Sequence, residues 1–214
     1  MDDIVLMADD RVASIPVDEC GEPLVVVRDL AVSAHKAELG GDRVYVRAGV
    51  AERLYDAARR LPDGVRLLFV EGWRAPLVQR HYFESYRDLL RRDGIADDPA
   101  ELDRLASRYV SPPRVAPHSA GAAVDLTLCT AAGAELDLGT RVNASPEESD
   151  GACYTAAANI GPEAARNRAV LSEAMTAAGF VNYPTEWWHW SYGDRYWALV
   201  TGAAAAIYGP ATRP

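Results

Sequence analysis

The sequence has little that would support a disulfide framework, a thiolate metal site or a membrane anchor. Its three cysteines, Cys20, Cys129 and Cys153, are dispersed over 214 residues and form no CxxC pair. This pattern argues against a zinc ribbon or a redox motif and predicts free thiols. No apolar run reaches the about 20 residues of a membrane span. The acidic start lacks the basic and apolar regions of a signal peptide, so we expect a cytoplasmic protein.

Basic residues are also scarce. Lys and Arg number 22 against 31 Asp and Glu, which gives a net charge of −9. Nucleic acids and anionic membrane surfaces bind basic patches, so we expect neither as a partner. Hydrophobic residues make up 49% of the chain, an ordinary globular share. We predict a single domain over residues 1–214, with residues 201–214 as a loosely packed tail. The oligomeric state is left open.

Hydrophobic periodicity and turn residues predict a mixture of strands and helices. We expect helices and strands in separate stretches, which indicates an α+β domain with a small, mostly antiparallel sheet flanked by helices. Residues 139–154 are polar and irregular and are predicted to form a loop over the site. Strands are expected at residues 24–28, 65–70, 124–128, 135–138 and 187–191, and helices at residues 50–61, 76–91, 99–109 and 162–178.

Two segments carry residues typical of a hydrolytic metal site. The run Glu186-Trp187-Trp188-His189 places a carboxylate three residues before an imidazole, and His118 precedes Asp125 by seven residues. Together they supply two imidazoles, one aspartate and one spare glutamate. A hydrolytic zinc site needs three protein ligands, an open position for water and a base, and this set provides the ligands and the base.

The spacing alone leaves other interpretations open. Residues three apart face opposite sides of a strand but the same side of a helix, so Glu186 and His189 share a site only if the chain bends or is helical there. A histidine among tryptophans is ordinarily a packed residue, and large aromatics are ordinarily buried in a core. Asp125 favours the metal site, because an unpaired carboxylate in an apolar strand is costly and a metal ion would remove that cost.

Taken together, the motifs resemble the D-alanyl-D-alanine dipeptidases associated with vancomycin resistance, within the wider group of zinc D-Ala-D-Ala peptidases. Hedgehog amino-terminal signalling domains look like distant relatives of the same fold. The resemblance therefore implies a small α+β zinc-peptidase domain, in agreement with the pattern of elements. The matching stretches are residues 71–76 (EGWRAP), 118–128 (HSAGAAVDLTL), 139–140 (GT), 167–168 (NR), 179–180 (GF) and 186–190 (EWWHW).

The resemblance also implies a role for each matching residue. His118, Asp125 and His189 would hold one zinc ion per chain. Glu186 would act as general base and then protonate the leaving amine. Arg74 would donate hydrogen bonds to the substrate carbonyl and its oxyanion. The substrate implied is a small dipeptide, with D-Ala-D-Ala as the family default.

The positions expected to contact the substrate depart from the family pattern. Ala116 stands where the family has a serine, and Asn143 stands where it has an aspartate that holds the substrate's ammonium group. We include Ser119, beside the first ligand, with these two as candidate substrate-binding positions. Asparagine supplies no charge, so recognition of a free amino terminus should weaken. Hydrolysis of another small amide or of an N-blocked peptide is therefore an alternative. A non-catalytic zinc-binding domain is disfavoured, because a structural site needs neither Glu186 nor Arg74.

Overall fold

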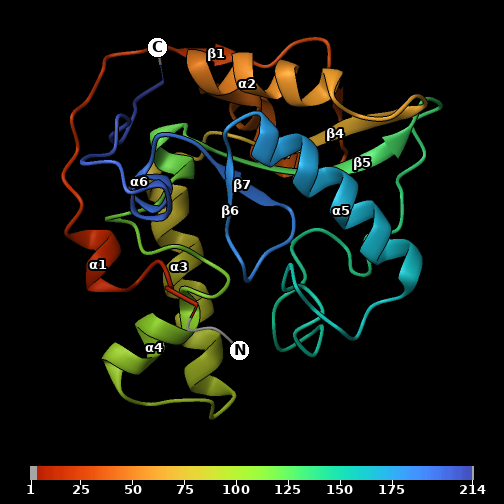
Figure 1. Ribbon diagram of the computed structural model, residues 1–214. Helices are drawn as coiled ribbons and strands as arrows, with labels where there is room; N and C mark the ends of the chain where they lie inside the picture. Colours follow the sequence, from red (N-terminus) through yellow and green to blue (C-terminus); the bar gives the residue numbers. More distant parts are fainter. Residues whose placement is uncertain (1–3, 214) are drawn as a thin grey trace.

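The computed structural model describes residues 4–213 and centres on a five-stranded sheet (Figure 1). Its strand order is β2-β4-β5-β7-β6, in which only the β2–β4 pair is parallel. The strands are β2 (Ala31–Val32), β4 (Val65–Glu71), β5 (Ala123–Thr130), β6 (Val181–Asn182) and β7 (His189–Ser191). A separate antiparallel pair joins β1 (Leu24–Val26) to β3 (Tyr45–Arg47). The predicted α+β fold with a mostly antiparallel sheet is confirmed.

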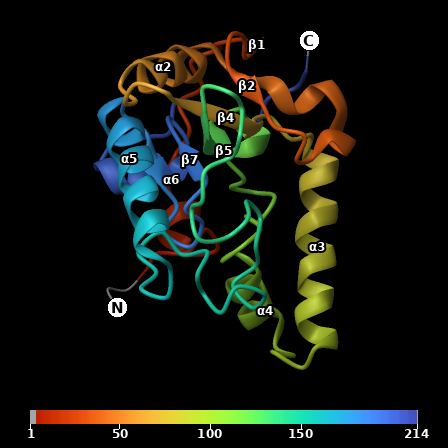
Figure 2. The same cartoon turned by 90° about the vertical axis from the view of Figure 1, so that its right-hand side faces the viewer.

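The longer helices lie on different sides of this sheet. Figure 2 shows α5 on one side and α3, with α4 at its far end, on the other. Turning segments at Ala37–Val44 and His118–Ala120 have the tighter 3₁₀ geometry. The helices are α1 (Asp10–Ala13), α2 (Ala48–Arg59), α3 (Pro76–Arg92), α4 (Pro99–Ala106), α5 (Pro162–Ala177) and α6 (Arg195–Thr201).

Local chemistry explains where the helices begin and end. Asp98 caps α4, because its side chain accepts a hydrogen bond from the backbone N–H of Glu101 at 2.9 Å. Proline occupies the first turn of α3, α4 and α5, where its missing N–H costs nothing. Gly179 follows α5 at a φ of 89°, the left-handed conformation that commonly ends a helix.

The main hydrophobic core joins the sheet to α2 and α5. Strand β5 is buried at every position except its last, so both of its faces are covered. Asp125 lies inside this strand and is 2% exposed. A carboxylate in such a place needs compensating partners, and the neighbouring strands bring them. A smaller apolar cluster packs α3 against α4.

Two predicted strands are shorter than expected. Residues 135–138 form only an isolated bridge, Cys129 with Glu135, because the turn after β5 leads directly into a loop. Strand β7 begins at His189, and the two tryptophans before it lie in a turn. Residues 139–154 contain no helix or strand, in agreement with the prediction of a loop. No helix of the described chain is long and apolar enough to cross a membrane.

The expectation of a loosely packed tail is wrong for residues 206–211. Ala206 forms a bridge with Val17, and Tyr208 is 2% exposed. Arg47 donates a hydrogen bond to the carbonyl of Gly209 at 2.9 Å. These contacts are made across long sequence separations, so the composition of the segment gave no sign of them.

Candidate metal centre and active site

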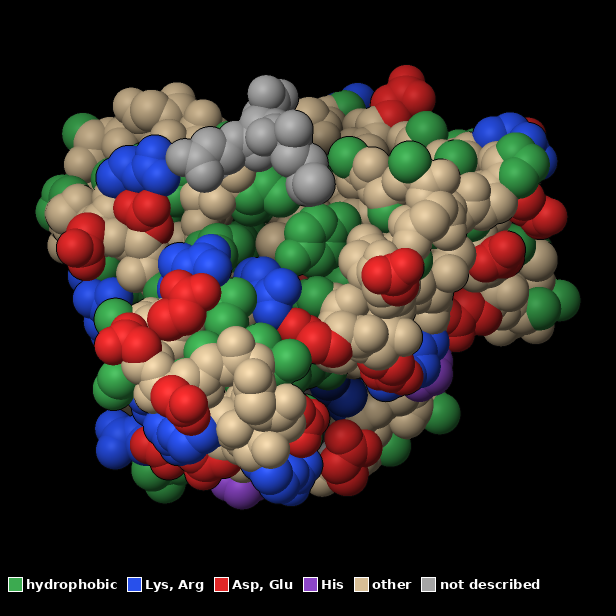
Figure 3. All heavy atoms as spheres, turned by 90° about the horizontal axis from the view of Figure 1, so that it is seen from below, with side chains coloured by type: hydrophobic (Ala, Val, Ile, Leu, Met, Phe, Trp, Pro, Cys, Tyr) green, Lys and Arg blue, Asp and Glu red, His purple; other side chains and the backbone are tan. Residues whose placement is uncertain are grey.

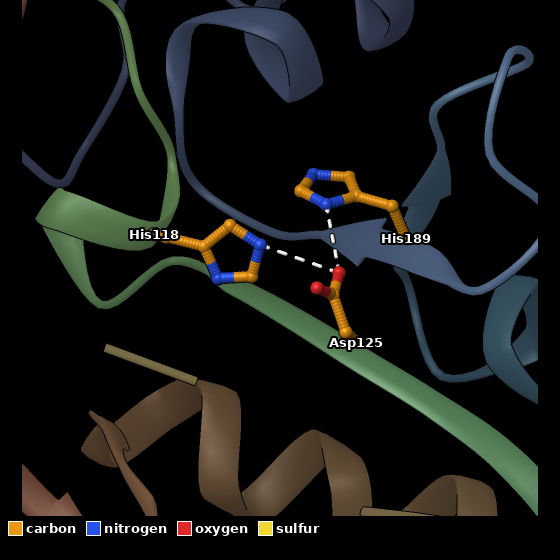
Figure 4. A group of neighbouring side chains, drawn as sticks. All are labelled: His118, Asp125 and His189. Atoms are coloured by element: carbon orange, nitrogen blue, oxygen red, sulfur yellow. Dashed lines mark hydrogen bonds and ion pairs between the residues drawn. The ribbon is translucent and has the colours of Figure 1, made fainter. Parts of the chain in front are cut away.

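Three elements bring His118, Asp125 and His189 together. His118 opens the short 3₁₀ turn before β5, and Asp125 lies within β5. His189 is the first residue of β7, where the antiparallel register places it directly opposite Asp125. All three side chains are buried and point toward one another, as Figure 4 shows. Backbone pairing in the sheet therefore builds the cluster.

The hydrogen-bonding pattern leaves a lone pair of His118 facing a carboxylate oxygen. His118 Nδ1 lies 2.7 Å from the carbonyl oxygen of Gly72, which can only accept, so this nitrogen carries the proton. In the neutral ring, Nε2 is then an acceptor, and it lies 3.3 Å from Asp125 Oδ1. His189 Nδ1 lies 3.0 Å from the same oxygen. A cation between these atoms would relieve the contact between two acceptors.

These residues fit a zinc ion. One ligand atom from each residue lies within 4.8 Å of the others. Bonds of about 2.0–2.2 Å to a tetrahedral ion place two ligand atoms roughly 3.3 Å apart, close to the 3.3 and 3.0 Å that separate Asp125 Oδ1 from the nitrogens of His118 and His189. Burial lowers the pKa of His189, which favours the neutral imidazole that a metal requires. Two imidazoles and one carboxylate are a ligand set typical of zinc.

The electrostatics of Asp125 also suit a metal ligand. Burial alone would raise its pKa, but the two neighbouring imidazoles, His118 foremost, hold that pKa well below its usual value. The carboxylate is therefore in its anionic form, the form that binds a divalent cation.

A turn brings Glu186 to the cluster. The backbone N–H of His189 donates to the carbonyl of Glu186 at 3.2 Å, so the chain bends between them. The bend lets two residues three positions apart face the same site, and it places Glu186 Oε2 3.8 Å from His189 Nδ1. Burial, followed by the negative charge of Asp125, raises the pKa of Glu186 well above its usual value. A carboxylate with a raised pKa is suited to accept and return a proton near neutral pH.

Arg74 follows β4 and is held rigidly by two neighbours. Its Nε and Nη2 donate to the two oxygens of Glu71 at 2.6 and 2.7 Å, and its Nη1 donates to Gln79 Oε1 at 2.8 Å. The amide of Gln79 in turn donates to the carbonyl of Ser111. These bonds use three of the five N–H donors of the guanidinium, so two remain for a ligand. Sequence reasoning missed Glu71 and Gln79, although Glu71 lies in the EGWRAP motif.

One cavity of about 390 Å³ joins these groups. One part of its wall is formed by the metal ligands, Glu186 and Arg74, and the rest mixes aromatic and aliphatic side chains with polar ones. A concave pocket in which polar groups converge beside an apolar surface is typical of a small-molecule site. The other lining residues are Lys36, His81, Tyr82, Ser85, Tyr86, Leu89, Tyr109, Val110, Ser111 and Asn143.

The three candidate substrate-binding positions lie in different places. Asn143 lines the cavity, and its carbonyl accepts a hydrogen bond from the hydroxyl of Tyr109 at 3.0 Å. Ser119 instead donates from its hydroxyl to the carbonyl of Arg74 at 3.1 Å, so it supports the backbone beside the site. Ala116 borders a smaller hollow on another part of the surface. The structure thus brings only Asn143 of these three to the cavity.

Acidic and basic side chains are interspersed on the face shown in Figure 3, with no broad patch of one sign.

Comparison with known proteins gives consistent results. The family model for the D-Ala-D-Ala dipeptidases of peptidase family M15 matches residues 41–201. A D-alanyl-D-alanine dipeptidase of Synechocystis sp. is 30% identical over 219 residues, covering 86% of this chain and 87% of that protein. A D-alanyl-D-alanine dipeptidase of Escherichia coli K12 is 40% identical over 72 residues, which cover 34% of this chain and 35% of the relative.

Among solved structures, the chain is similar to the LD-carboxypeptidase LdcB at 20% identity. The TM-score is 0.48, and the match covers 88% of this chain and 76% of that one. The family match extends over most of the chain and includes every candidate catalytic and metal-binding residue. The chain is therefore a metallopeptidase that belongs to the M15 family of D-Ala-D-Ala dipeptidases.

Proposed function

We propose that this protein is a zinc-dependent dipeptidase that hydrolyses the amide bond of D-Ala-D-Ala. The observation that carries the proposal is the convergence of Glu186, Arg74 and the three candidate ligands on one cavity. The names of the relatives support the choice of dipeptide. We expect the enzyme to act on a cytoplasmic pool of this small substrate.

Each residue has a distinct part in the proposed reaction. His118, Asp125 and His189 would hold the metal. A bound zinc ion lowers the pKa of a coordinated water to about 7 and polarises a carbonyl. Glu186 takes the proton of the attacking water and gives it to the leaving amine. Arg74 donates its two remaining N–H groups to the carbonyl oxygen as negative charge develops there.

Metal analysis combined with a dipeptide panel tests this proposal. We expect protein purified without added zinc to contain one equivalent of metal, and His118→Ala to lose it. The zinc-loaded protein should hydrolyse D-Ala-D-Ala faster than L-Ala-L-Ala. Absence of hydrolysis of every D,D-dipeptide by a folded, metal-loaded protein would refute the proposed function.

A second candidate substrate is an N-blocked peptide or another small amide. Asn143 supports it, because the residue brings no charge to the place where the family has an aspartate. Within the described chain, the only carboxylates that line the cavity are Asp125 and Glu186, and both have other roles. Rates on D-Ala-D-Ala and N-acetyl-D-Ala-D-Ala separate the two candidates. A strong preference for the free amine would count against the second.

A further inference from the structure

Lys36 is the only lysine in the sequence, whereas arginine supplies all the other basic side chains. It lies just before the Ala37–Val44 turn and lines the cavity, with 15% of its side chain exposed. Arg43 fixes this segment, because its Nη1 donates to the carbonyls of Ser33 and Val70 at 3.0 and 2.9 Å. The lysine is thus held at the cavity by an ordered segment.

The ammonium group of Lys36 is only partly occupied by protein partners. It donates to Glu71 Oε2, an oxygen that also accepts from Arg74. Its other ionic neighbour in the described chain is Asp125 Oδ2, at 3.7 Å, which is beyond hydrogen-bond distance. An ammonium group has three N–H donors, so two remain for a ligand.

With a divalent metal bound, the charges around the cavity would sum to one net positive charge. Lys36 and Arg74 share the single negative charge of Glu71. The charge of a divalent metal would be balanced by Asp125 and Glu186. A partly buried positive charge is costly, and an anionic group of the substrate would offset that cost. The lining therefore matches a ligand group that carries one negative charge.

We propose that Lys36 binds the carboxyl-terminal carboxylate of the substrate and so determines specificity for peptides with a free carboxyl end. This inference rests on the proposed function and deepens it. Lys36 and Arg74 contact the same carboxylate of Glu71. If Arg74 holds the scissile carbonyl, the terminal carboxylate lies one residue away, about 3.5 Å along the chain. Lysine suits this place because its compact ammonium on a flexible stem can turn from Glu71 to a ligand.

Calorimetric titration of zinc-loaded Glu186→Gln tests the inference without turnover. The ligands are D-Ala-D-Ala and its carboxyl-terminal amide, which lacks the negative charge. In this background, Lys36→Met should weaken binding of the acid by roughly 10–100-fold, the value of one charge-assisted hydrogen bond. Binding of the amide should change by less than about threefold, and Lys36→Arg should restore part of the affinity for the acid.

Arg53→Met is the matched control, because Arg53 packs on the ring of Tyr192 and does not line the cavity. It should leave both titrations unchanged. Equal weakening of acid and amide by Lys36→Met, or no weakening of either, would overturn the inference and leave Lys36 as a partner of Glu71 alone. Zinc content and thermal unfolding of each variant confirm that the fold and the metal site persist.

Steady-state kinetics separate this inference from the proposed function. With active enzyme, Lys36→Met should raise KM for D-Ala-D-Ala and largely preserve kcat. If the unmodified protein hydrolyses no dipeptide while Lys36 still discriminates acid from amide in calorimetry, the proposed function fails and the carboxylate site stands. If hydrolysis occurs but Lys36→Met affects acid and amide alike, the inference fails by itself.

Discussion

The two walls of the cavity are built differently. The first, which we call the metal wall, consists of His118, Asp125, Glu186 and His189, and is held by backbone pairing between β5 and β7. The second, the binding wall, consists of residues from α3, residues 109–111, the 139–154 loop and the segment at Lys36. Paired strands and the turns at their ends position the chemistry, whereas loops and a helix surface face the substrate. Changes in the binding wall can therefore alter recognition without disturbing the metal wall.

Two buried glutamates at this site, Glu71 and Glu186, also differ, because their pKa values shift in opposite directions. Burial would raise the pKa of Glu71, but Arg74 and Lys36 outweigh it and lower that pKa to about 2. For Glu186 the same two cations are outweighed, because burial and the negative charge of Asp125 raise its pKa. One carboxylate is a permanent anion that positions a cation, and the other can exchange a proton. Environment rather than residue type assigns the two roles.

Replacing the base in the metal wall should have the largest effect. Glu186→Gln keeps the size and removes the proton acceptor, so kcat should fall by about 10²–10⁴-fold, the usual contribution of a general base. Metal content should stay at one equivalent, because the three candidate ligands remain. Activity assays with metal analysis on the same preparation check this. If the variant retains activity within a factor of ten, Glu186 is not the general base.

Removing Arg74 should have the next largest effect. Arg74→Met takes away the donors to the developing oxyanion, and we expect a loss of about 10²–10³ in kcat. Gln79→Leu is a milder change, because it keeps the guanidinium and removes only the hydrogen bonds of Gln79, to Arg74 Nη1 and to the carbonyl of Ser111. Its loss in kcat should be smaller, with little change in KM. If Gln79→Leu were as damaging as Arg74→Met, misfolding of the site rather than lost positioning would explain both.

The contrast between the walls also explains what the sequence could predict. The histidines, the aspartate and the glutamate of the metal wall lie in two short motifs, residues 118–125 and 186–189, so their types and order identified them. The contacts of Lys36 were not predictable, because residues 36, 71 and 125 meet only through the parallel β2–β4 pairing and the β4–β5 register. Glu186 and His189 needed a turn that no rule of strand or helix periodicity supplies.

Restoring a charge in the binding wall should produce a moderate effect on specificity. Asn143→Asp introduces a carboxylate where the family holds the substrate's ammonium group. The ratio of kcat/KM for D-Ala-D-Ala to that for N-acetyl-D-Ala-D-Ala should rise about tenfold, as expected for one exposed charge-assisted bond. The change should appear mainly in KM. An unchanged ratio would show that Asn143 does not meet the amino end of the substrate.

The smallest effect on activity should follow from removing a hydrogen bond that ties the 139–154 loop to α3 in the binding wall. The hydroxyl of Tyr86 on α3 donates to Glu147 in the 139–154 loop, which also pairs with Arg108. Burial raises the pKa of Tyr86, so the hydroxyl remains a donor at neutral pH. Tyr86→Phe should lower the free energy of unfolding by about 0.5–1.5 kcal/mol, the net value of one hydrogen bond.

The midpoint of thermal unfolding should accordingly fall by about 1–6 °C. KM should rise with kcat unchanged, since the loop carries Asn143 to the cavity but holds no metal ligand. Tyr82→Phe serves as the control, because its ring also lines the cavity while the described structure gives its hydroxyl no hydrogen bond. A fall in kcat or in metal content for Tyr86→Phe would mean that the two walls are coupled, and that the loop helps to position the chemistry as well as the substrate.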